Sequence, residues 1–172
     1  SEEFDSVMEI VSSNAGDEKV VKFSLLKEVL VPLDSQKDGE AVWANYVMGV
    51  VLEYLDKVFA KNSGFCLSIK ASIVGNVPLG SGLSSSAALE VAIATFLEGF
   101  VTRGQPINDQ DAELRAIERA IKCQHSENTF CGVPCGIMDQ FVSSAGVEGC
   151  ALLIDCENNT FIPAKIGPPR QG

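Results

Sequence analysis

The sequence predicts an α+β fold, and three observations favour it over a regular alternation of strands and helices. Two short β-rich runs, residues 4–11 and 19–25, flank the turn-forming cluster 12–17, as in a hairpin. Apolar residues recur at helical spacing over 41–61, which predicts a helix. Residues 65–74 then alternate apolar and polar side chains, which predicts a half-buried strand. The chain therefore opens in the order strand, strand, helix, strand.

The rest of the sequence predicts two loops, three more helices and a closing pair of strands. In chain order these are a polar loop over 32–39, a glycine-containing loop over 75–82, helices over about 84–101, 109–126 and 136–145, and strands over 151–155 and 160–162. Asn108 is the expected N-cap of the second of these helices, because its side chain can accept a hydrogen bond from a free N–H of the first turn.

The composition is that of one globular domain. The 172 residues include 46% apolar and 21% charged residues, and the formal net charge is −10. Binding to a phosphate backbone relies on clustered Lys and Arg, so no nucleic-acid partner is expected. No apolar run reaches the roughly 18 residues that suggest a membrane span, and no segment resembles a secretory signal. These features predict a cytoplasmic protein without a membrane partner.

Six cysteines raise the alternatives of disulfides or a metal site. A disulfide framework is unusual in a chain of this size with ample apolar residues. His125, Cys131 and Cys135 are spaced loosely like zinc ligands, but the sequence has no C-x2-C pair and no evident fourth ligand. Buried, reduced thiols are therefore predicted, and a zinc site is the minor alternative.

The segment 78–90 joins a glycine-containing loop to a serine-rich helix start. Gly80 and Gly82 allow positive φ and a close approach of a ligand to the backbone. Ser84 to Ser86 add hydroxyls where the first N–H groups of a helix have no intrahelical partner. With the helix dipole these groups predict a phosphate site, although a serine-capped helix after a flexible turn fits the pattern as well. The Walker, dinucleotide-binding and nucleophile-elbow patterns are absent from the sequence.

The same segment resembles the second signature of the GHMP small-molecule kinases, and further stretches strengthen the resemblance. These stretches are residues 43–47, 83–91 and 132–141, the last of them extended by 152–156. Within the family, the pattern is most similar to the galactokinase group. The resemblance covers about residues 42–156, and residues 4–25 more loosely.

The resemblance implies a fold and a domain organisation. Residues 1–163 are expected to form the N-terminal, ATP-binding domain of these kinases, an α+β domain of the ribosomal protein S5 domain 2-like type. Residues 164–172 are expected to lead toward a C-terminal domain. The first family signature, similar to G-R-x-N-L-I-G-E-H-x-D-Y, and the glycine-rich third signature do not occur in the chain. With Ser at position 1, this predicts an internal piece of a longer enzyme, incomplete at its start.

The resemblance also implies an activity. The expected reaction is transfer of the γ-phosphoryl group of ATP to the C1 hydroxyl of galactose, with Mg²⁺ as the metal and with a monomeric full-length enzyme. One alternative is a kinase for another sugar, such as N-acetylgalactosamine, galacturonate or arabinose. A second alternative is a non-catalytic regulator that binds galactose and ATP on the same fold.

Several residues take nucleotide-binding roles by this resemblance. They are Gly80, Gly82, Ser84 and Ser85 for phosphate oxygens, Ser86 and Glu127 for Mg²⁺, and Trp43 and Tyr46 for the adenine pocket. Mg²⁺ is a hard cation, and oxygen ligands suit it. Without the resemblance, Glu127 is a solvated charge at a helix end and the two aromatics are core residues. Asn128 departs from the His usual in close relatives, and this is not expected to abolish the site.

Asp139 is the candidate catalytic residue. It lies among small and apolar neighbours, where an acidic group needs a specific reason to be present. Without the resemblance, a helix-capping or salt-bridged aspartate is the favoured interpretation. The resemblance instead implies contact with the anomeric hydroxyl of the sugar, as a general base or as an orienting group, and it places the backbone of Gly136 close to the sugar.

Overall fold

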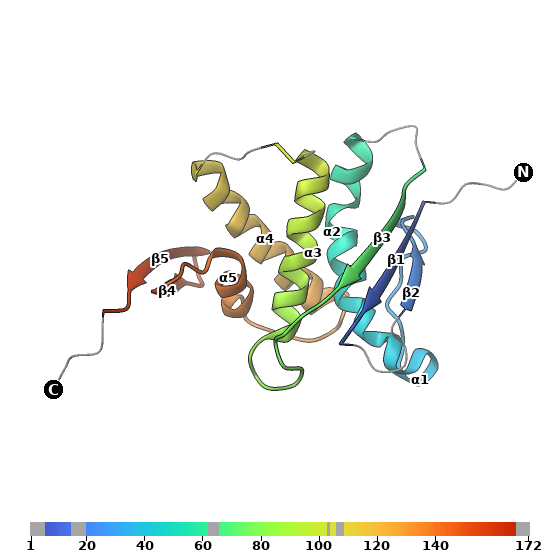
Figure 1. The fold of residues 1–172 in the computed structure, drawn as a ribbon, viewed down its shortest axis with the longest axis horizontal. Coiled ribbons are helices and arrows are strands. Elements are labelled where there is room, and N and C mark those ends of the chain that lie inside the picture. The colour runs from blue at the N-terminus through green and yellow to red at the C-terminus, as the bar shows by residue number, and fades with distance from the viewer. Residues whose placement is uncertain (1–5, 15–19, 62–65, 103, 106–108, 168–172) are drawn as a thin grey trace, which may run out of the picture.

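The computed structural model describes residues 6–14, 20–61, 66–102, 104–105 and 109–167. Figure 1 shows a small sheet on one side, three long helices next to it, and a short helix with a β-hairpin on the other side. This mixture of helices and strands confirms the predicted α+β class.

The first sheet has three strands in the order β2-β1-β3. Its strands are β1 (Val7–Ser12), β2 (Val20–Ser24) and β3 (Ser68–Ile73). The antiparallel pairing of β1 with β2 confirms the predicted hairpin, although residues 4 and 19 lie outside the described residues. β3 pairs with β1 in parallel, so that Met8 lies opposite both Phe23 and Ile69. All three side chains are buried, and they form the sheet's contribution to the main core.

The polar segment before the long helix is more ordered than the sequence predicts. It contains the short helix α1 (Ser35–Asp38), the 3-10 helix η1 (Gly39–Ala44) and then α2 (Asn45–Lys61). The α-helix predicted from residue 41 therefore begins at Asn45. The Asn45 side chain accepts a hydrogen bond from Leu33 N (2.8 Å) and donates one to Leu33 O (2.9 Å). These bonds tie the first residue of α2 to the segment that precedes α1.

The remaining helices agree with the prediction to within a few residues. They are α3 (Ser85–Thr102), α4 (Asp109–Thr129) and α5 (Met138–Ala145). The predicted cap Asn108 lies outside the described residues. α3 occupies the centre, because it packs against α2, α4 and α5.

α3 combines a length of 18 residues with an apolar composition. Among the described residues it is a helix long and apolar enough to cross a membrane, judged by length and mean hydropathy alone. Glu90 and Glu98 nevertheless lie on it, the first fully buried and the second ion-paired to Arg119. Inward carboxylates with partners are typical of the core helix of a folded domain.

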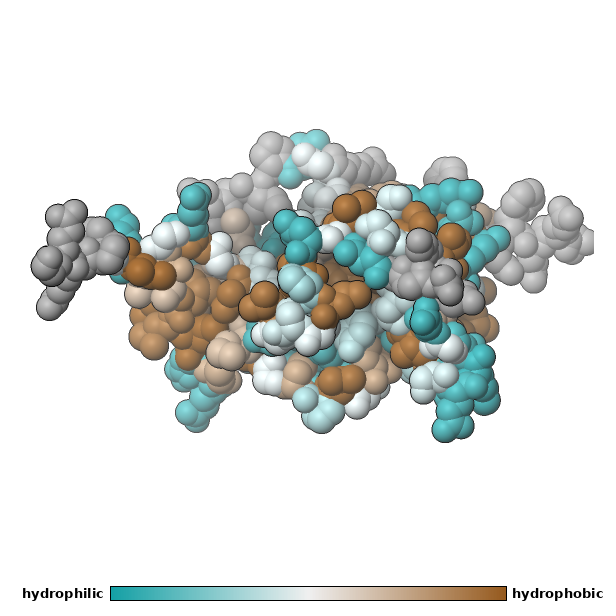
Figure 2. All heavy atoms as spheres, turned by 60° about the horizontal axis from the view of Figure 1, so that its bottom comes forward, coloured by the Kyte–Doolittle hydropathy of each residue, from teal (hydrophilic) through white to brown (hydrophobic). Residues whose placement is uncertain are grey.

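The closing hairpin consists of β4 (Cys150–Asp155) and β5 (Thr160–Lys165), as predicted but longer at both outer ends. Ile154 and Phe161 pack beside Phe141 of α5 in a small second core. Other apolar side chains of the hairpin, Leu153 and Ile162 among them, are exposed. Figure 2 shows apolar side chains gathered at this end of the molecule.

The cysteines only partly follow the prediction of buried thiols. Cys123 is buried on α4, whereas Cys66 and Cys156 are exposed. The two exposed residues lie just before β3 and in the turn between β4 and β5, where the chain runs along the surface.

A close contact between α2 and α4 depends on Gly49. A Cβ atom at this position would collide with the Ser126 side chain and would lie 3.0 Å from Phe130 Cβ. We expect Gly49→Ala to lower the free energy of unfolding by about 1–3 kcal/mol, because overpacking outweighs the roughly 1 kcal/mol that alanine gains in a helix. Denaturant unfolding of the protein made from its complete coding sequence measures this.

Gly99→Ala is the matched control, because Gly99 lies in α3 with no atom within 4 Å of a Cβ placed there. This variant should be as stable as the wild type or up to about 1 kcal/mol more stable. Equal stability of the Gly49→Ala variant and the wild type would show that the two helices can separate at no cost.

Candidate functional site

The loop between β3 and α3 has a backbone suited to binding an anion. Gly80 and Gly82 have φ values of +66° and +73°, and Ser84 follows with +57°. Positive φ at alternate residues turns successive N–H groups toward one side, which is the geometry of an anion-binding nest. A Cβ at either glycine would meet no atom within 4 Å, so the loop is open to solvent. The predicted phosphate contact of these glycines is therefore sterically accessible.

The start of α3 differs from the prediction by one residue, and the difference is informative. The helix begins at Ser85, and the carbonyl of Ser84 accepts the first hydrogen bond, from Ala88 N (3.0 Å). A positive φ is strained for serine, and such strain concentrates at binding sites. Within the described part of the chain, no residue forms a hydrogen bond with the hydroxyls of Ser84, Ser85 or Ser86. These hydroxyls and the helix N-terminus are left for an external ligand.

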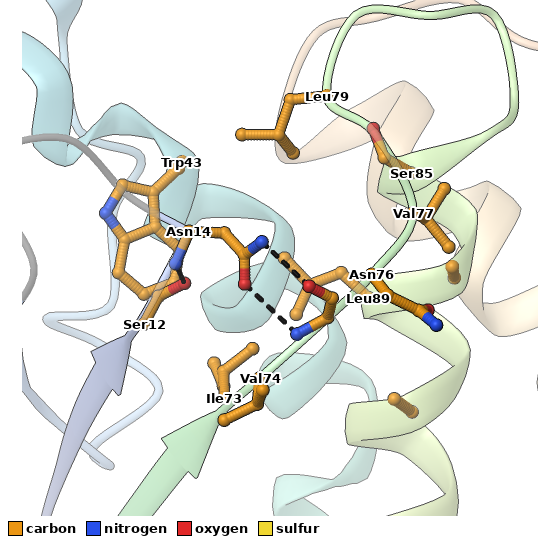
Figure 3. A pocket seen from close by; sticks show the side chains of 13 residues that line it. Ser12, Asn14, Trp43, Ile73, Val74, Asn76, Val77, Leu79, Ser85 and Leu89 are labelled. Carbon is orange, nitrogen blue, oxygen red and sulfur yellow. Dashed lines mark hydrogen bonds between the residues drawn. The ribbon is translucent and has the colours of Figure 1, made fainter.

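An apolar pocket of about 260 Å³ lies beside this helix start. Trp43 of η1 and Leu79 of the loop face it from different sides, and Ser85 reaches its rim (Figure 3). Asn14 holds the wall opposite the helix, because its Nδ2 donates to Gly75 O (2.8 Å) and its Oδ1 accepts from Gly75 N (3.0 Å). A flat apolar group that carries a phosphate tail suits a pocket next to an anion site.

Trp43 lines this pocket, whereas Tyr46 is not among its lining residues. Tyr46 lies in the first turn of α2 and is half-buried beside the acidic groups described next. Burial is the main cause that raises the pKa of its phenol, and the negative charge of Glu127 adds to it. The phenol is therefore neutral at pH 7 and available as a hydrogen-bond donor.

A buried polar cluster lies where α3, α4 and α5 meet. Glu90 and Gln140 are fully buried, and Glu127 is 5% exposed. Gln140 Nε2 donates to Glu127 Oε2 (2.7 Å) and to Glu90 Oε2 (3.3 Å). Burial, followed by the charge of Glu127, raises the pKa of Glu90 to about 8. The interpretation of Glu127 as a solvated helix-end charge is wrong, because the chain after α4 folds back over it.

The sequence analysis missed Glu90 and Gln140. Glu90 stands inside a quoted family stretch and Gln140 directly follows the candidate catalytic residue, but neither has a pattern that predicts a buried partner. One available signal is that Glu90 is the lone charged residue in the first half of α3. Such a residue in a core helix needs a polar partner.

The segment between α4 and α5 is held by Asn128. Its Oδ1 accepts from Cys135 N (2.7 Å), and its Nδ2 donates to Cys135 O (3.5 Å), to which Gln124 also donates (3.2 Å). Asn128, which replaces the His usual in close relatives, therefore fixes the segment that leads into α5. The Cys135 thiol donates to Glu127 Oε2 (3.3 Å).

Both nearby thiols are protonated at pH 7. Burial, together with the hydrogen bond to Glu127, raises the pKa of Cys135 to about 11, and burial together with the charge of Glu90 raises the pKa of Cys131 to about 12. Among the residues that the structure describes, no cluster of three His, Cys, Asp or Glu side chains supports the alternative of a zinc site. His125 lies apart, with its side chain largely exposed and Nδ1 2.7 Å from Glu53 Oε1.

Asp139 lies in the first turn of α5, exposed to solvent. Among the described residues it forms no hydrogen bond and no ion pair, and the N-cap residue of α5, Ile137, provides no side-chain cap. The interpretation of Asp139 as a capping or salt-bridged residue therefore has no support. Gly136, three residues before it, is also exposed, and a Cβ there would meet no atom within 4 Å. Both groups are free to contact a small ligand.

The residues predicted to hold Mg²⁺ fit such an ion by their chemistry. Ser86 lies one turn before Glu90 on the same face of α3, and Glu90 is joined through Gln140 to Glu127. One hydroxyl and one carboxylate, completed by phosphate oxygens and water, form a donor set that Mg²⁺ accepts. Within the described ranges, no three His, Cys, Asp or Glu side chains are grouped as a metal site. A nucleotide would therefore have to supply the other ligands.

Two basic residues of α4, Arg119 and Lys122, serve the scaffold. Arg119 donates to both carboxylate oxygens of Glu98 (2.7 and 3.2 Å) and to Ser144 Oγ. Lys122 lies over the ring of Tyr54, 4.2 Å from its centroid, and donates to Glu53 O. In this arrangement, neither side chain is directed at the anion-binding loop.

Comparison with known proteins gives one consistent result. A family profile described as GHMP kinases N terminal domain matches residues 45–147. Galactokinase from Homo sapiens is 47% identical over 124 residues, 72% of this chain and 28% of the relative. Galactokinase from Clostridium beijerinckii is 39% identical over 114 residues, 66% of this chain and 26% of the relative. The chain thus spans 26–28% of the length of these relatives.

The fold is similar to that of a solved enzyme of the same name. The crystal structure of Lactococcus lactis galactokinase complexed with galactose superposes with a TM-score of 0.70 at 25% sequence identity. The superposition covers 95% of this chain and 37% of that one.

Proposed function

The chain belongs to the GHMP kinase family, and we propose that the protein is an ATP-dependent galactokinase. The observation that carries this proposal is the loop with positive φ at Gly80, Gly82 and Ser84, which leads into a helix next to an apolar pocket. The names of the similar proteins and the galactose in the Lactococcus lactis structure favour galactose as the acceptor.

The apolar pocket and the start of α3 would bind different parts of the nucleotide. Trp43 and Leu79 offer apolar surface to the adenine, and Ser85 lies where the pocket meets the helix start. The N–H groups and hydroxyls that begin α3 would bind phosphate oxygens and stabilise their charge. Such a site needs no basic patch, which agrees with a net charge of −10.

The sugar would bind at the start of α5. There the Asp139 carboxylate would accept a hydrogen bond from the C1 hydroxyl, as a general base or as an orienting group. As the sugar oxygen forms its bond to the γ-phosphorus, the bond from that phosphorus to the ADP oxygen breaks, and the hydroxyl proton leaves to Asp139 or to water. Mg²⁺, held by Ser86 and Glu127, would neutralise phosphate charge.

The test is a sugar panel with the protein made from its complete coding sequence. We expect ADP release and a sugar monophosphate with galactose and Mg-ATP, and much slower turnover at equal concentrations of N-acetylgalactosamine, galacturonate or arabinose. The 172-residue chain by itself is the control, and it should show no measurable turnover. Turnover of another sugar with none of galactose would contradict the proposal, and so would binding of galactose and ATP without turnover.

A further inference from the structure

Two carboxylates share one amide in the buried cluster, and only one of them is a candidate ligand of Mg²⁺. Glu127 and Glu90 reach Gln140 Nε2 from α4 and α3 respectively, at 2.7 and 3.3 Å. A primary amide nitrogen has two hydrogens, so each carboxylate receives one of them. The side-chain hydrogen bonds of Glu127, from Gln140 and from the Cys135 thiol, both end on Oε2. Its Oε1 is thereby left for another partner.

Two buried oxygens of the same cluster have no hydrogen-bond partner among the residues that the structure describes. They are Glu90 Oε1 and Gln140 Oε1, which belong to the two groups already joined by the 3.3 Å hydrogen bond. A buried oxygen without a partner is costly. A carboxylic acid and an amide can pair through two parallel hydrogen bonds, so one proton on Glu90 Oε1 would satisfy both oxygens.

The opposite orientation of the Gln140 amide is disfavoured. Exchange of its oxygen and nitrogen would place Oε1 2.7 Å from Glu127 Oε2 and next to Glu90 Oε2, where acceptors would face one another. The amide nitrogen is therefore directed at the two carboxylates.

We propose that Glu90 is a positioning residue, which clamps the Gln140 amide as a neutral acid so that Gln140 orients the Glu127 carboxylate toward the metal. This inference rests on the proposed function only in taking Glu127 as a ligand of Mg²⁺. Its physical advantage is one of charge. The clamp adds hydrogen bonds behind Glu127 without a second negative charge beside the nucleotide phosphates.

The raised pKa of Glu90 agrees with this geometry. At about 8, it leaves the group mostly protonated at pH 7, and its main cause is burial. Glutamine at position 90 would reproduce the neutral acid, because its Nε2 can donate to Gln140 Oε1 while its Oε1 accepts from Gln140 Nε2. Leucine would keep the approximate volume and remove both hydrogen bonds.

The experiment measures Mn²⁺ binding by electron paramagnetic resonance, with ATP present and sugar absent, on the protein made from its complete coding sequence. We expect the dissociation constant of Mn²⁺ to stay within twofold of wild type in Glu90→Gln and to rise about 10-fold or more in Glu90→Leu. Gln140→Met, which cuts the same link, should match the leucine variant and keeps the test valid if that variant does not fold. In thermal unfolding without metal, the melting temperature of Glu90→Gln should equal that of the wild type.

Glu98→Gln is the matched structural control. It neutralises another carboxylate on α3 that is only 13% exposed, in the ion pair with Arg119. This variant should lower the melting temperature and leave the Mn²⁺ dissociation constant within twofold of wild type. A change of metal affinity that follows stability in all variants would overturn the proposal.

Two further results would also overturn it. One is an equal loss of Mn²⁺ affinity in Glu90→Gln and Glu90→Leu, which would show that Glu90 acts as an anion. The other is unchanged affinity in both Glu90→Leu and Gln140→Met. If the wild type binds Mn²⁺ with ATP and the variants behave as expected, but galactose is not phosphorylated, the proposed function fails and the positioning role stands.

Discussion

Replacement of Asp139 by Asn should reduce kcat for galactose by about 100- to 10,000-fold, the range that a general base contributes. The carboxylate is exposed at the start of α5 and has no partner among the described residues, so no structural role competes with a chemical one. For the same reason, the melting temperature should change little. Steady-state kinetics and thermal unfolding of the protein made from its complete coding sequence measure the two effects.

The comparison of Asp139→Asn with Asp139→Ala distinguishes a base from an orienting group. An amide oxygen still accepts a hydrogen bond from the sugar hydroxyl, but it cannot take up the proton. If Asp139 is the base, both variants should be equally slow, and if it only orients the hydroxyl, Asn should retain more activity than Ala. Glu148→Gln is the control, because it removes an exposed carboxylate from the loop after α5 and should leave turnover unchanged. Undiminished turnover in Asp139→Ala would exclude any catalytic role.

Replacement of Glu127 by Gln should raise the Mg²⁺ concentration needed for half-maximal turnover by at least about 100-fold. The neutral amide keeps the shape of the side chain but loses the charge that would attract the cation. Loss of a neighbouring hydrogen-bonding group at metal sites already costs 10- to 100-fold, and loss of a ligand should cost no less. A titration of activity against free Mg²⁺ at saturating ATP measures the shift.

The stability of Glu127→Gln should move in the opposite direction to its activity. The wild-type carboxylate is a buried charge, so its replacement by a neutral amide removes the cost of keeping that charge away from water. We therefore expect a melting temperature equal to or higher than that of wild type, as is common for residues that serve function rather than folding. The control is Glu53→Gln. Glu53 lies on α2 and contacts His125 of α4, and its replacement should not shift the Mg²⁺ dependence of activity. A loss of activity that is explained entirely by unfolding would contradict the assignment.

Local patterns were sufficient to predict most elements of the fold. The helix α2 was predicted from its apolar stripe and the strand β3 from its alternation of apolar and polar residues. Side chains repeat on one face about every 3.6 residues in a helix and every 2 residues in a strand, so the two patterns can be distinguished in one sequence. The start of α2 was misplaced because it depends on Asn45, whose side chain bonds to Leu33 twelve residues earlier. A contact of that range leaves no periodic trace in the sequence.

In the candidate site too, some residues could be predicted from the sequence and others could not. The glycines and serines of the loop were recognisable because residue type decides whether positive φ and free hydroxyls are available. Glu90 and Gln140 were missed because their roles exist only where three helices meet.

By itself, the sequence determined that this chain has an α+β fold of the GHMP kinase type and a glycine- and serine-containing loop at the start of a core helix. These properties depend on residue type and on neighbours close in the chain. Only the tertiary structure decided that Glu127 is buried, that Glu90 lies within reach of the same amide, and that Asp139 faces solvent. Burial and charge coupling arise between segments far apart in sequence, and a carboxylate acquires its chemical character from those surroundings.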